Sequence, residues 1–275
     1  MAQNPLQQFF RQPKIFVGLP SGGIYNKPTT IQGETDRIPV FGMTGMDEIV
    51  MKTPDALLSG DSTVKVIQSC CPTIHDAWDL CSLDINLILT AIRIATFGGE
   101  LAVTNACSEC QTVNSYDINL NAIVDHYSKC KYDNRLVLDE LTIVTRPLTY
   151  KQSSSFALKN FEMQQKLKQL ASIEEETQRK ELMDSILQDL GNLRNEIFAA
   201  GIESIDTGST IVTEREFIRE WLENVDRSAM ESVVNHIEYN RDAWDTPKHH
   251  VKCDNCGHED DLTFDLDQTN FFVNA

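Results

Sequence analysis

The spacing of apolar residues changes several times along the chain, and these changes divide the sequence into segments. Residues 1–45 follow no regular period and are rich in Pro, Gly, Thr and Gln, so we expect an irregular N-terminal segment. Over residues 46–99 apolar side chains recur at helical spacing, most regularly through Ile85, Leu89 and Ile92. This pattern predicts a helical region.

Several residues within this region favour the start or the end of a helix. Residues that suit a helix start occur at Thr44, Thr53-Pro54, Thr63, Asp76 and Ser82. Gly98 can adopt the left-handed conformation that commonly ends a helix, so the last of these helices is expected to stop there.

The apolar period shortens to two over residues 100–148. Short strands are expected over residues 100–106 and 116–120. Apolar and polar side chains then alternate over residues 135–146, which predicts one further, half-buried strand.

Helical spacing returns over residues 149–245, which we interpret as a helical insertion. Apolar residues three and four apart form a coiled-coil-like stripe at Met163, Leu167, Leu170, Met183, Ile186, Leu190, Leu193 and Ile197. Glu174-Glu175-Glu176 interrupts the stripe without Gly or Pro, so one long helix and a helical hairpin both remain open. The stripe fits an amphipathic helix on its own core and a partner-binding arm equally well.

Shorter elements follow the stripe. A hairpin is expected over residues 205–212, with its turn at Thr207-Gly208. Thr213 and Glu216 predict a capping box for the next helix, and another helix is expected over residues 228–239. Residues 246–275 then contain a Cys-rich turn and short strands.

Charge limits the classes of partner that the chain can bind. Lys and Arg number 24 against 41 Asp and Glu, which gives a net charge of -17. Such a surface repels phosphate backbones and anionic lipid headgroups. The start of the chain does not look like a signal peptide, and the most apolar stretch, residues 87–97, is short and contains Arg93. We therefore expect a soluble protein in a reducing compartment, where cysteines serve as metal ligands or buried thiols.

Two Cys-x-x-Cys pairs give the strongest chemical signal in the sequence. Their members are Cys107, Cys110, Cys253 and Cys256. The two-residue spacing lets both thiolates of a pair face one ion, and two pairs supply the four ligands of a closed tetrahedral zinc site. The sequence therefore predicts one structural zinc ion per chain.

The flanks of the two pairs also match. When Cys107 is aligned with Cys253, the alternating residues 116–120 fall on residues 262–266, and a strand-like segment precedes each pair. We interpret the pairs as the two halves of one zinc ribbon, contributed by residues 100–148 and 246–275. A closed four-thiolate site has no open position, so it cannot activate water.

Other candidate sites are weaker. His249, His250 and His258 could replace a thiolate, but with four cysteines available we interpret them as surface histidines. The cysteines without ligand spacing, of which the first three are expected in the core, are Cys70, Cys71, Cys81 and Cys130. Phe271-Phe272 is likewise expected in the core. No phosphate-binding glycine loop, nucleophile elbow, zinc-protease motif or EF-hand occurs, so we do not expect an enzyme.

Several motifs follow one another along nearly the whole chain. They are the turn Leu19-Pro20-Ser21 with Gly23, residues 40–48 (VFGMTGMDE), Ser69-Cys70-Cys71-Pro72, residues 85–97 with Arg93 and Gly98, the first Cys pair, the helical insertion, the second Cys pair, Leu266-Asp267 and Phe271-Phe272. In this order they resemble the baseplate hub subunit and baseplate assembly protein family of T4-like contractile-tailed phages. The resemblance implies a late structural or assembly protein without catalytic residues.

The expected fold class is α+β. A helical N-terminal region accompanies a four-cysteine zinc ribbon, with a long coiled-coil-like helical insertion between the ribbon halves. The resemblance implies that the protein binds other baseplate or tail proteins in the host cytoplasm during assembly, and that it can remain in the virion. No nucleic acid, membrane or small-molecule substrate is expected.

The alternative function is that of a zinc-ribbon nucleic-acid-binding or transcription-regulating protein. Such a protein needs a basic surface with aromatic side chains beside the Cys pairs. Here the neighbouring residues are acidic, including Glu109, Asp254 and Glu259, which argues against this alternative.

Overall fold

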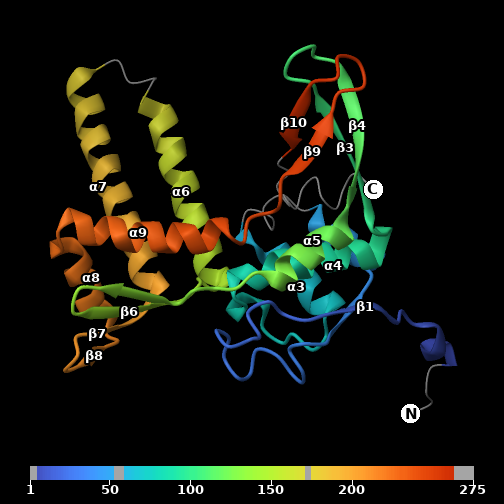
Figure 1. The fold of residues 1–275 in the computed structure, drawn as a ribbon, viewed down its shortest axis with the longest axis horizontal. Coiled ribbons are helices and arrows are strands. Elements are labelled where there is room, and N and C mark those ends of the chain that lie inside the picture. The colour runs from blue at the N-terminus through green and yellow to red at the C-terminus, as the bar shows by residue number, and fades with distance from the viewer. Residues whose placement is uncertain (1–4, 53–58, 171–174, 263–275) are drawn as a thin grey trace. The chain divides into compact units, whose positions relative to one another are not determined.

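The computed structural model describes residues 5–52, 59–170 and 175–262 (Figure 1). Over these residues the protein is a mixture of eight α-helices and small antiparallel sheets, which confirms the expected α+β class at this level. The helix expected from Thr53-Pro54, the strand residues after Leu262, and Phe271-Phe272 lie outside the described residues. Two compact units are present, Met1–Cys130 with Trp244–Ala275, and Lys131–Ala243.

Helix α4 (Ser82–Phe97) supplies much of the core of the first unit. Its buried apolar residues include Ile85, Leu87, Ile88, Leu89, Ala91, Ile92 and Ala95. They cover most of the helix circumference, whereas the sequence spacing predicted one stripe. A helix that is apolar all round is typically buried on all sides. Gly98 ends α4 with a φ of 102°, as expected.

The described part of the first unit contains further helices besides α4. They are α1 (Gly45–Met51), α3 (Asp61–Cys70) and α5 (Leu120–Lys129), together with the 3-10 helices η1 (Pro5–Phe9) and η2 (Ala77–Asp79). Thr44 caps α1 as expected, because its hydroxyl accepts the Asp47 N–H at 3.3 Å. Helix α3 begins at Asp61, two residues before the expected Thr63.

Three antiparallel strand pairs belong to the first unit. They are β1 (Pro13–Val17) with β2 (Ile38–Phe41), β3 (Glu100–Ala106) with β4 (Val113–Asn119), and β9 (His249–Lys252) with β10 (Glu259–Leu262). The strand expected over residues 116–120 is therefore part of β4. It ends at Asn119, whose side chain accepts the Asn121 N–H and caps α5, a helix that the sequence analysis missed.

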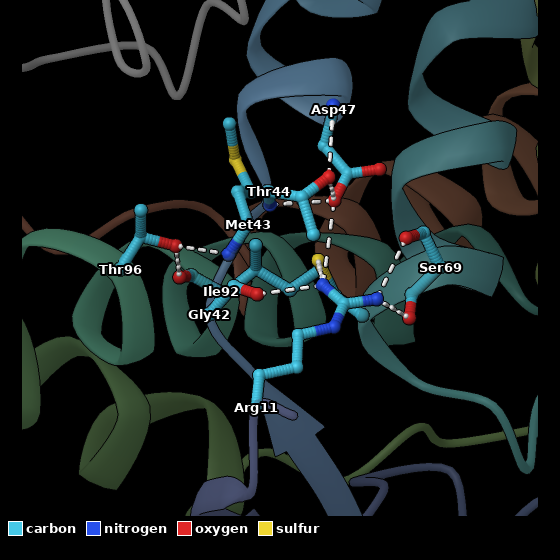
Figure 2. A network of polar contacts seen from close by, with 9 residues as sticks. Arg11, Gly42, Met43, Thr44, Asp47, Ser69, Ile92 and Thr96 are labelled. Atoms are coloured by element: carbon cyan, nitrogen blue, oxygen red, sulfur yellow. Dashed lines mark hydrogen bonds and ion pairs between the residues drawn. The ribbon is translucent and has the colours of Figure 1, made fainter. Parts of the chain in front are cut away.

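Arg11 joins the N-terminal segment to the helices of this unit (Figure 2). Its guanidinium donates to the carbonyl oxygen of Gly42 at 2.7 Å and to the carbonyl and hydroxyl oxygens of Ser69 at 2.7 and 2.9 Å. Asp47 lies 3.3 Å away and adds an ion pair. At Gly42 a Cβ would lie 2.8 Å from the carbonyl oxygen of Ala95, so only glycine fits this close approach.

The second unit contains a four-stranded antiparallel sheet. Its strands, in spatial order, are β5 (Arg135–Leu138), β6 (Leu141–Thr145), β7 (Ile202–Asp206) and β8 (Ile211–Val212). The single strand expected over residues 135–146 was wrong, since the chain turns back at Asp139, which has a φ of 50°. The apolar alternation runs through the turn without a Gly or Pro, so the pattern alone did not show the break. The hairpin expected over residues 205–212 is confirmed.

Helices α6 (Tyr150–Leu170) and α7 (Glu176–Gly201) form a helical hairpin (Figure 1). Ion pairs join Lys159 to Glu196 at 2.5 Å and Lys166 to Asp189 at 3.2 Å, which fixes an antiparallel register. The structure thus decides between the two arrangements that the sequence left open. The stripe residues Leu170, Ile186 and Leu193 are buried, while Leu167 and Met183 are partly exposed.

Helices α8 (Arg215–Asn224) and α9 (Arg227–Asp242) complete the second unit. The capping box expected at Thr213 and Glu216 was wrong: the N-cap of α8 is Glu214, and it makes no side-chain capping bond. Asp226 caps α9 by accepting the Ala229 N–H at 3.0 Å. The core that these helices share with the sheet contains Ile143, Phe198, Ala199, Ile202, Ile205, Ile218, Leu222 and Val233.

Candidate metal centre

Four cysteine side chains converge in the first unit. The Sγ atoms of Cys107, Cys110, Cys253 and Cys256 all lie within 4.8 Å of one another. The Sγ atoms of Cys107 and Cys256 are 3.6 Å apart, as are those of Cys110 and Cys253. A tetrahedral zinc ion with Zn–S bonds of about 2.3 Å needs sulfur atoms about 3.8 Å apart. The spacing of the thiols therefore fits a single four-coordinate ion.

Each Cys pair follows a strand and turns in the same way. Cys107 comes directly after β3, and Cys253 comes directly after β9. The N–H of Cys107 donates to the carbonyl oxygen five residues later at 2.9 Å, and that of Cys253 does so at 2.8 Å. The residues four positions after these cysteines, Gln111 and Gly257, have φ values of 59° and 74°. The two turns are thus local repeats of one backbone motif.

Asparagine side chains connect one turn to the thiols of the other. Asn114 is buried, and its amide donates to the Sγ of Cys253 at 3.4 Å. The side-chain oxygen Oδ1 of Asn114 accepts the backbone N–H of Asp254 at 3.2 Å. Asn255 in turn donates to the Sγ of Cys110 at 3.6 Å. N–H donors at sulfur orient ligands and favour the thiolate form.

Sequence reasoning did not identify these asparagines. The only available signal was their position, since Asn255 lies between the cysteines of the second pair and Asn114 lies in the strand after the first.

Hydrogen bonds and neighbouring thiols shift the pKa values of the cysteines in opposite directions. Hydrogen bonds with the side chain and backbone of Thr112, and with Asn255, lower the pKa of Cys110 to about 5. At Cys256 a hydrogen bond with the backbone of His258 acts to lower the pKa, but the neighbouring thiols, that of Cys110 foremost, outweigh it and raise the pKa to about 12. Four thiolates this close repel one another unless a cation lies among them.

The residues present fit a soft or borderline divalent metal ion. A Cys₄ set selects zinc or an iron centre over calcium or magnesium, which prefer oxygen ligands. Four protein ligands leave no position for water or a substrate, so an ion held here would stabilise the fold. Among the described residues, these cysteines are the group of His, Cys, Asp or Glu side chains with ligand atoms close enough to hold a metal.

The nearby histidines lie outside this set of ligands. His250 instead faces Asp261 across the β9–β10 pair, with Nδ1 3.2 Å from the carboxylate. Cys70, Cys71 and Cys81 are fully buried, as expected. Burial raises the pKa of Cys70 to about 12, which keeps this thiol protonated and unreactive near neutral pH.

No helix in the part of the chain that the structure describes is both long and apolar enough to cross a membrane.

Comparison with known proteins gives one finding. The sequence model of a family described as T4 bacteriophage base plate protein matches residues 14–273. The match spans both compact units and both Cys pairs. No curated protein and no solved structure matches the chain significantly.

Proposed function

The chain belongs to the T4 bacteriophage base plate protein family, and from this premise we propose that it is a structural or assembly protein of the baseplate hub. The observation that carries the proposal is the family match over residues 14–273. Membership implies a structural role in the phage baseplate, contacts with other tail proteins, and a place in the virion. The hub position, and assembly in the host cytoplasm beforehand, are the more specific parts of the proposal.

We further propose that the four-cysteine cluster is a structural zinc site, and that its two hairpins form a zinc ribbon. The sulfur spacing of 3.6 Å and the matching turns support this assignment. The ligands come from chain segments on either side of Lys131–Ala243 in the sequence. One ion would therefore hold both segments in place, and the protein would act without catalysis.

The α6–α7 hairpin is the proposed arm for binding baseplate partners. Two ion pairs and the buried residues Ile186 and Leu193 give it an internal seam of its own. A hairpin with its own seam can be shortened without exposing the rest of the core. It also leaves apolar side chains exposed along its length, among them Leu187.

The decisive experiment shortens the arm and follows its partners. Residues 167–188 are replaced by a short Gly-Ser bridge, which keeps both ion pairs because Lys166 and Asp189 remain. Loop-closure free energy grows with the logarithm of length, so this term should change by under about 1 kcal/mol. We expect the shortened protein to fold and to keep its metal, but to lose its partners in pull-downs from infected cells and its place in purified particles.

A matched control and two contrary outcomes make the result specific. The surface variant Gln188→Ala on the full-length arm should retain partners and incorporation. Recovery of the shortened protein in normal amounts from purified particles would contradict the proposed arm. A shortened protein that aggregates would show that the hairpin seam belongs to the core of the second unit.

A further inference from the structure

The β3–β4 and β9–β10 strand pairs repeat one register. Asn105 lies opposite Asn114 in the first pair, and Val251 lies opposite Asp260 in the second. The offset between these matching positions is constant along the strands, and it equals the separation of the first cysteines of the two Cys pairs. Both strand pairs belong to the first unit, where they lie side by side (Figure 1). They form two equivalent halves around the cysteine cluster, so a position in one half has a counterpart in the other.

Asn114 extends from the first half to a cysteine of the second. Its Nδ2 donates to the carbonyl oxygen of Thr112 at 3.0 Å and to the Sγ of Cys253 at 3.4 Å. Its Oδ1 accepts the backbone N–H of Asp254 at 3.2 Å. These three bonds determine which way the amide points. Since Asn114 is only 5% exposed, water does not compete for the bond to sulfur.

Asp260 is the counterpart of Asn114 in the second half. It also extends across to the other half, because its Oδ2 accepts the hydroxyl of Ser108 at 3.2 Å. A carboxylate accepts hydrogen bonds but donates none. Asp260 therefore cannot give Cys107 the N–H bond that Asn114 gives to Cys253.

A second pair of counterparts shows the same difference. Asn255 donates to the Sγ of Cys110 at 3.6 Å, whereas its counterpart in the first half is Glu109, which cannot donate when ionised. In the part of the chain that the structure describes, a side-chain amide thus reaches one cysteine of each Cys pair. At the position equivalent to each amide stands an acid.

This difference divides the four thiols into two kinds. N–H donors stabilise a thiolate, hold it in place and lower its nucleophilicity. An acid at the equivalent position removes the donor and adds negative charge, which favours release of the thiolate from a metal. Cys107 and Cys253 isolate the effect, because they occupy equivalent positions and are almost equally buried, at 6% and 4% exposure.

We propose that Asn114 and Asp260 are positioning residues that make the metal site asymmetric, so that Cys107 and Cys256 release the metal before Cys110 and Cys253. The inference rests on the proposed metal site, and it specifies which of the ligands are labile. Cys256 is the exposed member of the cluster. The metal would therefore enter and leave at Cys256, while the two thiols that accept amide N–H bonds keep their hold on it.

The first experiment compares the two equivalent, buried cysteines in the full-length, zinc-loaded chain. The protein is treated with iodoacetamide in less than equimolar amount, and molecules that carry a single label are analysed by peptide mass spectrometry. Label at Cys107 should exceed label at Cys253 about tenfold, as the loss of one outer hydrogen bond to a metal ligand implies. Cys256 should also react, but its exposure alone would account for that.

The second experiment exchanges the two counterparts without changing the charge or the composition of the chain. Asn114→Asp combined with Asp260→Asn moves the amide from Cys253 to Cys107. The order of labelling should then reverse, so that Cys253 reacts first. A role of these residues in folding alone would not reverse the order.

The single variant Asp260→Asn keeps the test decisive if the double variant does not fold, because Asp260 is partly exposed. It supplies both halves with an amide, so Cys107 and Cys253 should be labelled to similar extents. Transfer of zinc to a chelator should also slow about tenfold. The matched control, Asp261→Asn, removes the same charge from the neighbouring position of β10, where the side chain faces His250 instead. It should leave the order of labelling and the rate of transfer unchanged.

The outcomes separate this inference from the proposed function. Equal labelling of Cys107 and Cys253 in the wild type, or an unchanged order in the exchanged double variant, would overturn the inference and leave the metal site standing. Equal slowing of zinc transfer by Asp260→Asn and Asp261→Asn would also overturn it, because charge alone would then set the rate. A chain that binds no zinc would overturn the metal site itself, and the inference with it.

Discussion

At the residue scale, the buried carboxyl group of Asp84 shows how a polar side chain is accommodated in an apolar helix. Asp84 is fully buried in α4, where its oxygens accept the backbone N–H and the hydroxyl of Ser21 at 3.1 and 2.5 Å. Burial raises its pKa to about 6, although the two bonds from Ser21 act to lower it. The ionised form is therefore less favourable in the fold than in the unfolded chain.

We predict that Asp84→Asn changes the pH dependence of stability. An acid whose folded pKa lies above its unfolded value destabilises the fold when ionised, and this penalty disappears as pH falls through about 6. Relative to the Asn variant, the wild type should gain about 1.4 kcal/mol of unfolding free energy between pH 8 and pH 5, because pH 5 lies one unit below the folded pKa of about 6 and still above the unfolded pKa. Urea denaturation of both proteins at each pH measures the difference.

Asp79 provides a control, because its pKa is lowered in the fold whereas that of Asp84 is raised. Partial burial raises its pKa, but hydrogen bonds from Lys27 and Thr30 outweigh burial and lower it overall. Asp79→Asn should therefore destabilise the protein most at pH 8, and less as the pH falls. If the two variants showed the same pH trend, the assigned causes would be wrong.

We also predict that Arg11→Ala destabilises the first unit. The change removes three hydrogen bonds of 2.7–2.9 Å to Gly42 and Ser69 and the ion pair with Asp47. Because Arg11 is partly exposed and water replaces some of these contacts, we expect a loss of about 2 kcal/mol. Thermal melting measures it, with exposed Lys14→Ala as the control. Equal melting temperatures for the two variants would contradict the role given to the Arg11 network.

The sequence predicted single residues well where their signal is local. The Thr44 cap and the four cysteines were identified because spacing of two or three residues determines their chemistry. Arg11 and Asn114 were missed because their partners lie 31–58 and 139–140 residues away. Chain separation of this size leaves no pattern in one sequence.

At the element scale, the spacing of apolar residues predicted most helices and strands, but it did not show where one element ends and the next begins. The alternation over residues 135–146 continues through the turn at Asp139, so two strands looked like one. Helix α5 follows β4 directly and was missed because the strand pattern runs to its first residue. The stripe on α6 and α7 fitted a long helix and a hairpin alike, and the ion pairs seen in three dimensions were needed to decide.

We predict that the two Cys pairs contribute equally to metal binding. Cys107 and Cys253 follow their strands in the same way, and both are buried, so Cys107→Ser and Cys253→Ser should each reduce bound zinc from about one ion per chain to a small fraction. Elemental analysis of protein purified without chelator measures the content. Cys130→Ser, a thiol outside the cluster, should keep the metal. Full zinc content in either cluster variant would show that the sulfurs are not the ligands.

At the scale of the whole molecule, the chain order gives the metal centre a specific consequence. The first unit is assembled from the segments before and after Lys131–Ala243, and the cysteines come from both segments. The second unit has its own core, centred on Ile143, Ile205 and Val233. Metal binding should therefore stabilise one unit directly and leave the other to its own packing.

We predict that removing the metal opens the first unit locally. A structural zinc site contributes about 10 kcal/mol or more of apparent binding free energy to folding, and β3–β4 and β9–β10 are each two-stranded sheets, a kind of sheet that is only marginally stable alone. After chelation, hydrogen exchange should accelerate strongly at residues 100–119 and 249–262, whereas β6 and β7 should keep their protection. Added zinc should restore the original exchange, and Cys107→Ser should reproduce the open pattern without chelator. Equal acceleration in both units would mean that they unfold together, and unchanged exchange would mean that the hairpins are held by contacts other than the metal.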